Sequence, residues 1–416
     1  MRTAQVGVLA LAYALTGCFV DSGGGATNAD PGSTGAPAST GAPASTSDET
    51  TAAPVTTGSC TSPCDTAETT VTPDETTAPT TDTTGAPPTG ATFTKSADQE
   101  LPGAAALAAG RLDGDDMHDL VVAADPDLHL IHGSDLLHAD TYAVAPATAL
   151  ALLDFDGDGD HDIIAAGSGK VSTYRVGGQF TYLAAYDVAC PVAEALALGK
   201  INPDQYTDVV LGCGAAGVFQ FGGMADGVLL NPTQISAASA GDVGLADLID
   251  TDKTDLAYAD SATDTIGVLP GTGIFNGWDP ETALLLPYMT PVALALADVD
   301  ANGSTDIVAA SKEALCRTYR APFDSNSQPV EFACGQGVRD LVLGYLDPDT
   351  HLDVVVARAG NLEVSLGLGD GSFAAPQLYE AGPETTRVVL GDFNGDARLD
   401  IAALRLNGVS VLLQDG

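Results

Sequence analysis

Residues 152–164 read LLDFDGDGDHDII, an acidic loop between two apolar segments. Aspartate occupies every second position of the loop, at 154, 156, 158, 160 and 162. Like charges this close repel one another, so the loop needs either a bound cation or open access to water. The apolar flanks are typical of two buried strands joined by a tight turn.

The same unit recurs along the chain. An apolar strand, a nine-residue acidic loop and a second apolar strand appear seven times after residue 93. The loops end at Asp119, Asp162, Asp208, Asp255, Asp306, Asp353 and Asp400, with spacings of 43, 46, 47, 51, 47 and 47 residues. A period near 47 with several short strands per repeat predicts a β-propeller with one blade per repeat.

The two ends of the repeat array complement each other. The sixth copy continues past its second strand as VSLGLGDGSFAAPQLYEAG, whereas the seventh stops at VSVLLQDG. The missing segment precedes the first copy as ATFTKSADQEL, residues 91–101. We therefore predict an all-β fold, a seven-bladed β-propeller over residues 93–416 whose N-terminal strand closes the last blade and removes exposed sheet edges.

The composition narrows the choice of partners. The 416 residues carry a formal net charge of −41, and 45 of the 56 acidic residues are aspartate. Nucleic acids and anionic membrane surfaces require basic residues, so neither is expected to bind the protein directly. Aspartate is favoured in turns and metal-binding loops, which agrees with the repeated acidic loops.

The first 18 residues, MRTAQVGVLALAYALTGC, have the layout of an export signal. Their apolar run is too short to span a bilayer. The ending LTGC resembles the lipobox of bacterial lipoproteins, which implies a signal peptide at 1–17 and acylation of Cys18. Phe19 follows, and under the sorting rule of some Gram-negative bacteria a residue other than Asp there implies the outer membrane. We thus expect an exported protein that contacts the membrane through its lipid anchor only.

Residues 18–92 form a segment of different composition after the acylated cysteine. Residues 19–92 are rich in Thr, Pro, Ser, Ala and Gly, and hold nine acidic residues but neither Lys nor Arg. Such a segment cannot bury enough apolar surface to offset its chain entropy. We predict a disordered tether.

The loops of form DxDxDGxxD, together with the LGxGDGxF turn at Leu366–Phe373, resemble FG-GAP/VCBS repeat proteins. The seven-bladed head of integrin α chains belongs to this group. The resemblance covers residues 93–416. It implies that each loop joins the two strands of a hairpin and holds calcium, and that the calcium loops lie on the face opposite the ligand.

Calcium takes six to eight oxygen ligands in a flexible shell. In a nine-residue loop, side chains at positions 1, 3, 5 and 9 supply these oxygens, with a backbone carbonyl at position 7. Three loops carry the full set and predict about three Ca²⁺ ions: Asp154, Asp156, Asp158 and Asp162; Asp298, Asp300, Asn302 and Asp306; and Asp392, Asn394, Asp396 and Asp400.

The other loops are weaker candidates, which would raise the number of calcium ions to six at most. Three lack the first acid and have Arg111, Lys200 or Tyr345 there instead. Their remaining residues are Asp113, Asp115 and Asp119; Asn202, Asp204 and Asp208; and Asp347, Asp349 and Asp353. The fourth loop has its acids at Asp247, Asp250, Asp252 and Asp255, a spacing that predicts weak binding or none. The alternative for all seven is a turn whose carboxylates accept backbone amides.

Other polar residues give weaker signals of a binding site. His129, His132 and His138 lie within ten residues and could hold a transition metal, but the positions of the first two differ by an odd number, so their side chains should point to opposite faces of a strand. His118, His161 and His351 fall inside acidic loops and are expected to face solvent. Trp278 could stack on a sugar ring, although packing is the commoner role. Export favours two disulfides among Cys190, Cys213, Cys316 and Cys334, with the pairing left open.

These observations favour a calcium-binding propeller lipoprotein that acts at the cell surface as an adhesion module for a protein or a polysaccharide. The sequence shows no Ser, Cys or His constellation for nucleophilic catalysis, and it leaves a carboxylate pair for acid/base chemistry open. Enzymes built from similar repeats usually carry inserted segments, which the short spacing of these blades does not provide, so we do not expect an enzyme. Two alternatives remain, a lyase-like enzyme acting on polysaccharides and a passive structural lipoprotein of the envelope.

Overall fold

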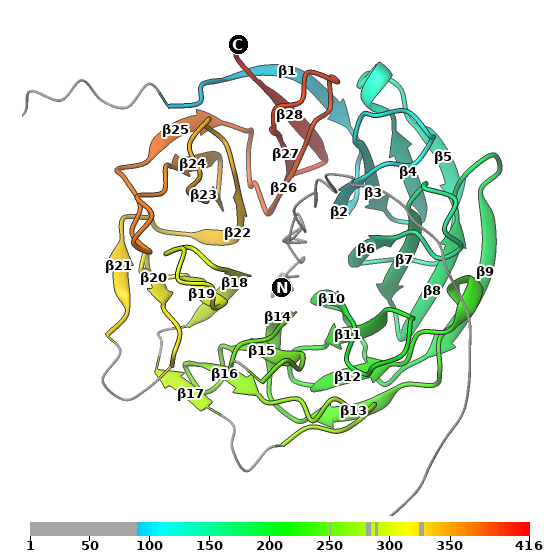
Figure 1. Cartoon of the computed structure of the whole chain (residues 1–416). Coiled ribbons are helices and arrows are strands. Elements are labelled where there is room, and N and C mark those ends of the chain that lie inside the picture. The colour runs from blue at the N-terminus through cyan, green and yellow to red at the C-terminus, as the bar shows by residue number, and fades with distance from the viewer. Residues whose placement is uncertain (1–89, 250, 280–283, 288–289, 324–327) are drawn as a thin grey trace, which may run out of the picture. The chain divides into compact units, whose positions relative to one another are not determined.

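Seven four-stranded antiparallel sheets surround a central axis in the computed structural model (Figure 1). The structure describes residues 90–249, 251–279, 284–287, 290–323 and 328–416. The predicted signal peptide, Cys18 and the tether predicted over residues 18–92, except its last three residues, lie outside these ranges. Blades 1 to 6 each take four consecutive strands, from β2–β5 to β22–β25, and blade 7 contains β26, β27, β28 and β1.

In blades 1 to 6 the strands follow one another outward from the axis in sequence order, and in blade 7 β26, β27 and β28 are followed by β1 at the outer edge. The innermost strands are β2 (Ala104–Gly110), β6 (Ala149–Leu153), β10 (Ala195–Gly199), β14 (Ala240–Ala246), β18 (Pro291–Ala297), β22 (Val338–Gly344) and β26 (Arg387–Gly391). The second strands are β3 (Asp119–Ala124), β7 (Asp162–Gly167), β11 (Asp208–Gly212), β15 (Asp255–Asp260), β19 (Asp306–Ser311), β23 (Asp353–Arg358) and β27 (Asp400–Arg405).

The third strands are β4 (Asp127–Ile131), β8 (Lys170–Arg175), β12 (Val218–Phe221), β16 (Thr265–Leu269), β20 (Cys316–Tyr319), β24 (Asn361–Ser365) and β28 (Gly408–Gln414). The outermost strands are β5 (Asp140–Ala143), β9 (Thr181–Asp187), β13 (Thr233–Ser236), β17 (Leu284–Pro287), β21 (Val330–Phe332), β25 (Gln377–Glu380) and β1 (Phe93–Glu100).

The closure predicted from the two chain ends is confirmed. β1 pairs antiparallel with β28, in a register that runs from Phe93 opposite Gln414 to Glu100 opposite Gly408. The first described strand of the chain therefore forms the outer edge of the last blade. This pairing closes the ring with backbone hydrogen bonds between the two ends of the repeat array.

The burial pattern explains the composition of the strands. All six residues of β3, β7, β15, β19 and β27 are buried, because both faces of these strands pack against neighbouring blades. The outermost strands are mostly exposed, as in β9 and β25. Alanine alternates with larger apolar residues near the axis, where the blades converge, as in the ALALL of β6 and the PVALALA of β18.

The antiparallel order divides the blade loops between two faces of the propeller. Turns from first to second strand lie on one face together with the loops that follow the third strands, including the short helices η1 (Gly133–Asp135) and η2 (Ala225–Gly227). We call this the acidic-loop face, because it carries the repeated aspartate loops, and the other the opposite face. Among the described residues no helix is both long and apolar enough to cross a membrane.

Two disulfides resolve the pairing that the sequence leaves open. Cys190, in the connection between β9 and β10, bonds to Cys213, just after β11, so this bridge ties the segment between blades 2 and 3 to blade 3. Cys316 in β20 bonds to Cys334, which follows β21 in blade 5. Each bridge closes a short segment of the chain, which limits the freedom of the unfolded chain.

Candidate metal centres in the acidic loops

The aspartate at position 9 has the same structural role in every blade. In blade 6, Oδ2 of Asp353 accepts the amide of Leu346 at position 2 of its own loop, at 2.7 Å. Oδ1 of Asp353 accepts the amide of Gly367, which begins the loop after the third strand, at 2.8 Å. The two equivalent bonds recur in the other six blades, with distances of 2.7 to 3.1 Å. Each of these carboxylates thus joins its own loop to the end of the third strand or to the segment that follows it.

Burial makes these carboxyl groups weaker acids than an exposed aspartate. The residues are almost fully enclosed, and burial raises the pKa of Asp162, Asp306 and Asp353 to about 6, although the two amides counteract the rise. Neighbouring acids in the same loops, such as Asp156 beside Asp162, raise the pKa further. A cation bound in the loop would favour the ionised form.

Blades 2 and 5 bring three carboxylates together. Oxygen atoms of Asp154, Asp156 and Asp162 lie within 4.8 Å of one another, as do those of Asp298, Asp300 and Asp306. Both sets comprise positions 1, 3 and 9, the spacing that the sequence predicts for calcium. The first carboxylate also orders the turn, since Asp298 accepts the amides of Asn302 at 3.0 Å and Gly303 at 2.8 Å.

Guanidinium groups distinguish the three complete loops. In blade 2, Nε of Arg175 lies 3.0 Å from Oδ2 of Asp156, a charge contact without hydrogen-bond geometry. In blade 7, Arg398 forms an ion pair with Asp396 at 2.5 Å. A cation in either loop must compete with an arginine that the chain already supplies. The convergent set of blade 5 consists of carboxylates alone, so blade 5 offers the most direct calcium site.

The weaker loops make the side chain to backbone bonds of turns, as the complete loops also do. In blade 3, Asn202 accepts the amide of Asp204, which accepts the amide of Tyr206. Blade 6 repeats this pattern, where Asp347 and Asp349 accept the amides two residues further along. In blade 4, Asp247 accepts the amides of residues 251 and 252, while Asp250 lies outside the described residues. These carboxylates and amides make the side chain to backbone bonds of the turn alternative.

The histidines in the loops connect blades. The prediction that His118 and His161 face solvent is wrong, since both are half-buried between neighbouring loops. His161 of blade 2 exchanges two hydrogen bonds with the backbone of Arg111 in blade 1, at 3.0 and 2.6 Å. His118 of blade 1 makes the matching pair of bonds to Asp392 of blade 7, at 3.2 and 2.7 Å. Position 8 of one loop therefore holds position 1 of the preceding loop.

Burial lowers the pKa of both His118 and His161, so near neutral pH the uncharged ring predominates at these contacts. A neutral imidazole can accept the backbone amides that it faces. These inter-blade bonds were missed by sequence reasoning, because they depend on two loops that lie 43 residues or more apart.

The three histidines near β4 do not share one site. His129 bonds to Thr141 at 3.0 Å, and His138 pairs with Asp135 at 2.6 Å. His132 turns instead into the acidic loop of blade 1, beside Asp113 and Asp119. The side chain of Trp278 donates to Oε1 of Gln220 at 2.9 Å and packs against the core between blades 3 and 4, which favours the packing role over sugar stacking.

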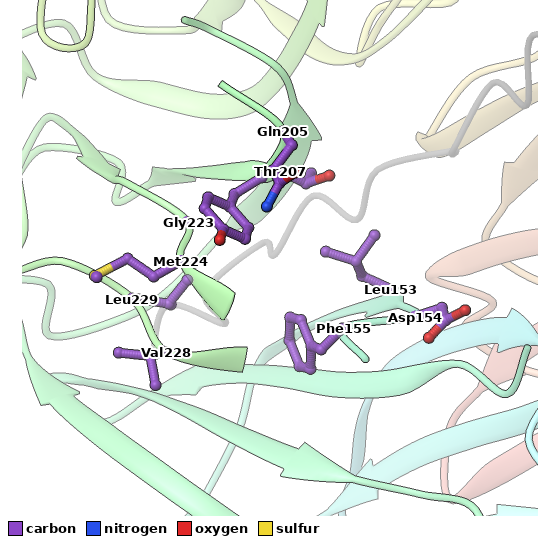
Figure 2. Close-up of a pocket in the computed structure, with 10 residues that line it drawn as sticks. Leu153, Asp154, Phe155, Gln205, Thr207, Gly223, Met224, Val228 and Leu229 are labelled. Atoms are coloured by element: carbon purple, nitrogen blue, oxygen red, sulfur yellow. The ribbon is translucent and has the colours of Figure 1, made fainter. Parts of the chain in front are cut away.

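A small pocket opens beside the acidic loop of blade 2 (Figure 2). Leu153 and Phe155 line one side, and Leu229 and the exposed Met224 and Val228 line the other, with Asp154 next to Phe155. Its volume is about 80 Å³. Pockets that enclose small-molecule ligands measure roughly 300 to 1,000 Å³, so this one is too small to enclose a sugar residue.

A second group of charges is buried toward the opposite face. The residue four positions before the end of each innermost strand is alanine in four blades, but it is Asp242 in blade 4, Asp340 in blade 6 and Arg387 in blade 7. All three are at most 3% exposed. Asp242 accepts the amide of Leu294 in blade 5 at 2.8 Å, and Asp340 accepts that of Val388 in blade 7 at 3.0 Å.

Burial also controls the ionisation of this group. It raises the pKa of Asp242 to about 8 and that of Asp340 to about 7, while the charge of Arg387 lowers both. The half-buried Glu194, next to β10, has its pKa raised by burial to about 7, and Arg387 again opposes the rise. Three carboxyl groups from three blades therefore share the field of one guanidinium.

Comparison with known proteins agrees with this geometry. Residues 346–403, which run from the acidic loop of blade 6 to that of blade 7 and β27, match a family model described as an FG-GAP-like repeat. The chain carries an FG-GAP-like repeat. This match, on a propeller of seven blades, confirms the resemblance drawn from the loops. No curated relative matches the sequence.

Solved structures with a similar fold include BBS1N, in a crystal structure in complex with ARL6DN and soaked with mercury. It is 11% identical, with a TM-score of 0.58, and the match covers 78% of this chain and 98% of that one. The structure described as streptogramin B lyase is 12% identical, with a TM-score of 0.51 and coverage of 78% and 98%. At these identities the likeness shows the fold alone.

Proposed function

We propose that this FG-GAP repeat propeller is a calcium-binding, lipid-anchored module of the bacterial cell envelope that binds a protein or a glycan. The observation that carries the proposal is the convergence of carboxylates at positions 1, 3 and 9 in blades 2 and 5. These are oxygen donors at the spacing expected for a hard divalent cation. An adhesion role is compatible with the propeller fold, which presents many loops on a rigid ring.

Calcium in this proposal stabilises the propeller and does not touch the ligand. The acidic loops are already fixed at position 9 and at the inter-blade histidines, so a bound ion would tighten a set of loops that hold adjacent blades together. It would also neutralise part of the large negative charge of the chain. Partner binding is then expected to need calcium only indirectly, through stability.

Calcium should raise the melting temperature of the purified chain on the order of 10 °C over its value in EDTA, because each filled site adds about 2.7 kcal/mol at 100 times its dissociation constant. Titration calorimetry should give a stoichiometry near three. The Asp300→Asn variant should lose one equivalent, whereas Asp187→Asn, on the exposed strand β9, should bind as the wild type does. An unchanged melting temperature and no binding heat would show that the loops are hydrogen-bonded turns.

In this proposal the exposed loops recognise the partner, and the propeller does not catalyse a reaction. The pocket beside Asp154 is too small to enclose a sugar residue, so we place the partner on exposed loops and not in this pocket. Incubation with polysaccharides that contain uronic acids should release no new reducing ends. Release of such ends would support the enzyme alternative instead.

The lipid anchor rests on the LTGC motif, outside the described residues. Expression in a Gram-negative host with a labelled fatty acid should label the chain, and the Cys18→Ser variant should lose the label and leave the membrane fraction. Fractionation of inner and outer membranes would test the position that Phe19 implies. A labelled Cys18→Ser variant would contradict the assignment of Cys18 as the acylated residue.

A further inference from the structure

The acidic loop of blade 1 departs from the calcium pattern at its first position. Arg111 stands where blades 2 and 5 have aspartate, and its backbone is held by His161 of the next blade. The loop therefore lacks the carboxylate that completes the oxygen set in those blades. Asp113 and Asp119 remain, at positions 3 and 9.

A histidine takes the place of the missing acid. His132 follows β4, and its Nδ1 lies 3.0 Å from Oδ2 of Asp113 and 3.7 Å from Oδ1 of Asp119. Donor atoms of all three residues lie within 4.8 Å of one another. The Nδ1 atom is buried and has no hydrogen-bond partner, so a ring nitrogen with a free ligand position points into the cluster.

This feature is specific to blade 1. The residue equivalent to His132 directly precedes the amide that the position 9 aspartate accepts. In the other blades it cannot act as a nitrogen ligand, being Arg175, Gly222, Pro270, Arg320, Leu366 and Leu413.

We propose that His132, Asp113 and Asp119 bind a borderline transition metal of the zinc class. Imidazole nitrogen with carboxylate oxygen suits Zn²⁺ and its neighbours, whereas calcium takes oxygen ligands. Ligand atoms around a tetrahedral zinc ion lie about 3.3 Å apart, from metal–ligand distances near 2.0 to 2.1 Å. The two distances from Nδ1 lie on either side of this value. The proposal does not depend on the calcium sites of the other blades.

The surroundings of the cluster support a metal site. Asp119 accepts the amides of Leu112 at 2.7 Å and Gly133 at 2.9 Å, one on each oxygen. These bonds fix the orientation of the carboxylate, and each oxygen keeps a second lone pair for a metal ion. Oδ2 of Asp140 in β5 lies 3.5 Å from Nε2 of His132, on the other side of the ring. Histidine ligands of metals commonly face a carboxylate in this way, which sets the tautomer and orients the ring. Asp113 and His132 are partly exposed, so an ion can reach them.

Cobalt is the probe for the test, because tetrahedral Co²⁺ absorbs visible light strongly and octahedral Co²⁺ does so weakly. The full chain, freed of metal and then saturated with Ca²⁺, is titrated with Co²⁺. We expect one equivalent with an intense tetrahedral spectrum that Zn²⁺ removes and further Ca²⁺ does not. The His132→Ala variant should bind at least about tenfold more weakly.

His138→Ala is the matched control, since the ring of this exposed histidine pairs with Asp135, outside the cluster. The Co²⁺ titration of this variant should equal that of the wild type. Circular dichroism checks that each variant is folded. Should His132→Ala fail to fold, Asp113→Asn, on the exposed part of the loop, replaces it with the same expected loss. The proposal is overturned if Co²⁺ binds wild type and variant alike, if its spectrum is octahedral, or if Ca²⁺ displaces it.

Discussion

Replacing Asp255 by alanine is expected to lower the free energy of unfolding by about 3 to 5 kcal/mol. The buried carboxylate accepts three amides, from Leu248 at 2.9 Å, Ile249 at 3.1 Å and Gly271 at 2.8 Å. Alanine leaves all three donors unsatisfied inside the protein, and each such group costs about 1 to 3 kcal/mol. Urea denaturation followed by circular dichroism measures the loss.

The loss should be equal in EDTA and in calcium, because the loop of blade 4 does not have the calcium spacing. Lys253→Ala, an exposed change in the same loop, should alter stability by no more than about 0.5 kcal/mol. A loss for Asp255→Ala that disappears in EDTA would mean that the aspartate acts through a metal ion. Equal losses would identify the position 9 aspartates as fixed structural links, whether or not a loop holds metal.

The fold was predictable because one local interaction recurs with a fixed period. Each position 9 aspartate starts a second strand, and the apolar segments on both sides of its loop have to be buried on both faces. The period therefore counts the blades, and the incomplete seventh copy indicates that residues 91–101 close the ring. Both inferences follow from pattern alone, without knowledge of how the blades touch.

The contacts between blades were not predictable in the same way. His161 meets Arg111 only when blades 1 and 2 pack together, and His118 meets Asp392 only after the ring has closed. Within blade 1, the distance of His132 from Asp113 depends on where β4 ends relative to the acidic loop. In sequence these histidines are isolated polar residues, and only the packed blades show which partner each one faces.

The buried charges near the axis can be recognised when the repeats are aligned with one another. Aligning the innermost strands on their position 9 aspartates places Ala106, Ala149, Ala195 and Ala293 in register with two acids and an arginine. Alanine at four equivalent places marks a site with little room. Asp242, Asp340 and Arg387 at the same depth therefore have to compensate one another.

Replacing Arg387 by methionine is expected to lower the free energy of unfolding by about 3 to 5 kcal/mol at pH 8. Methionine fills much of the same space but removes the positive charge that opposes the buried carboxylates of Asp242 and Asp340. Urea denaturation of the Arg387→Met variant measures this loss of unfolding free energy. The control is Arg320→Met, which removes an exposed arginine of blade 5. The control should lose no more than about 0.5 kcal/mol.

The effect should depend on pH in a direction fixed by the raised pKa values. The carboxyl groups of Asp242, Asp340 and Glu194 bind protons more tightly in the folded chain than in the unfolded one, where their pKa is about 4. Their contribution to stability is therefore complete below pH 4 and is lost as the pH rises through 7 to 8. Without the guanidinium their pKa values rise further, so Arg387→Met should be nearly as stable as the wild type at pH 5 and much less stable at pH 8.

Neutralising an acid should rescue the variant, because the missing charge is then no longer needed. Asp340 is the acid to change. After burial, the charge of Arg387 is the strongest influence on the pKa of Asp340. In asparagine, the amide oxygen can still accept the amide of Val388, so the link from blade 6 to blade 7 is kept. The double variant Asp340→Asn with Arg387→Met should recover a large part of the stability at pH 8. A loss that is the same at pH 5 and pH 8, with no rescue, would show that Arg387 stabilises the ring by packing and not by charge.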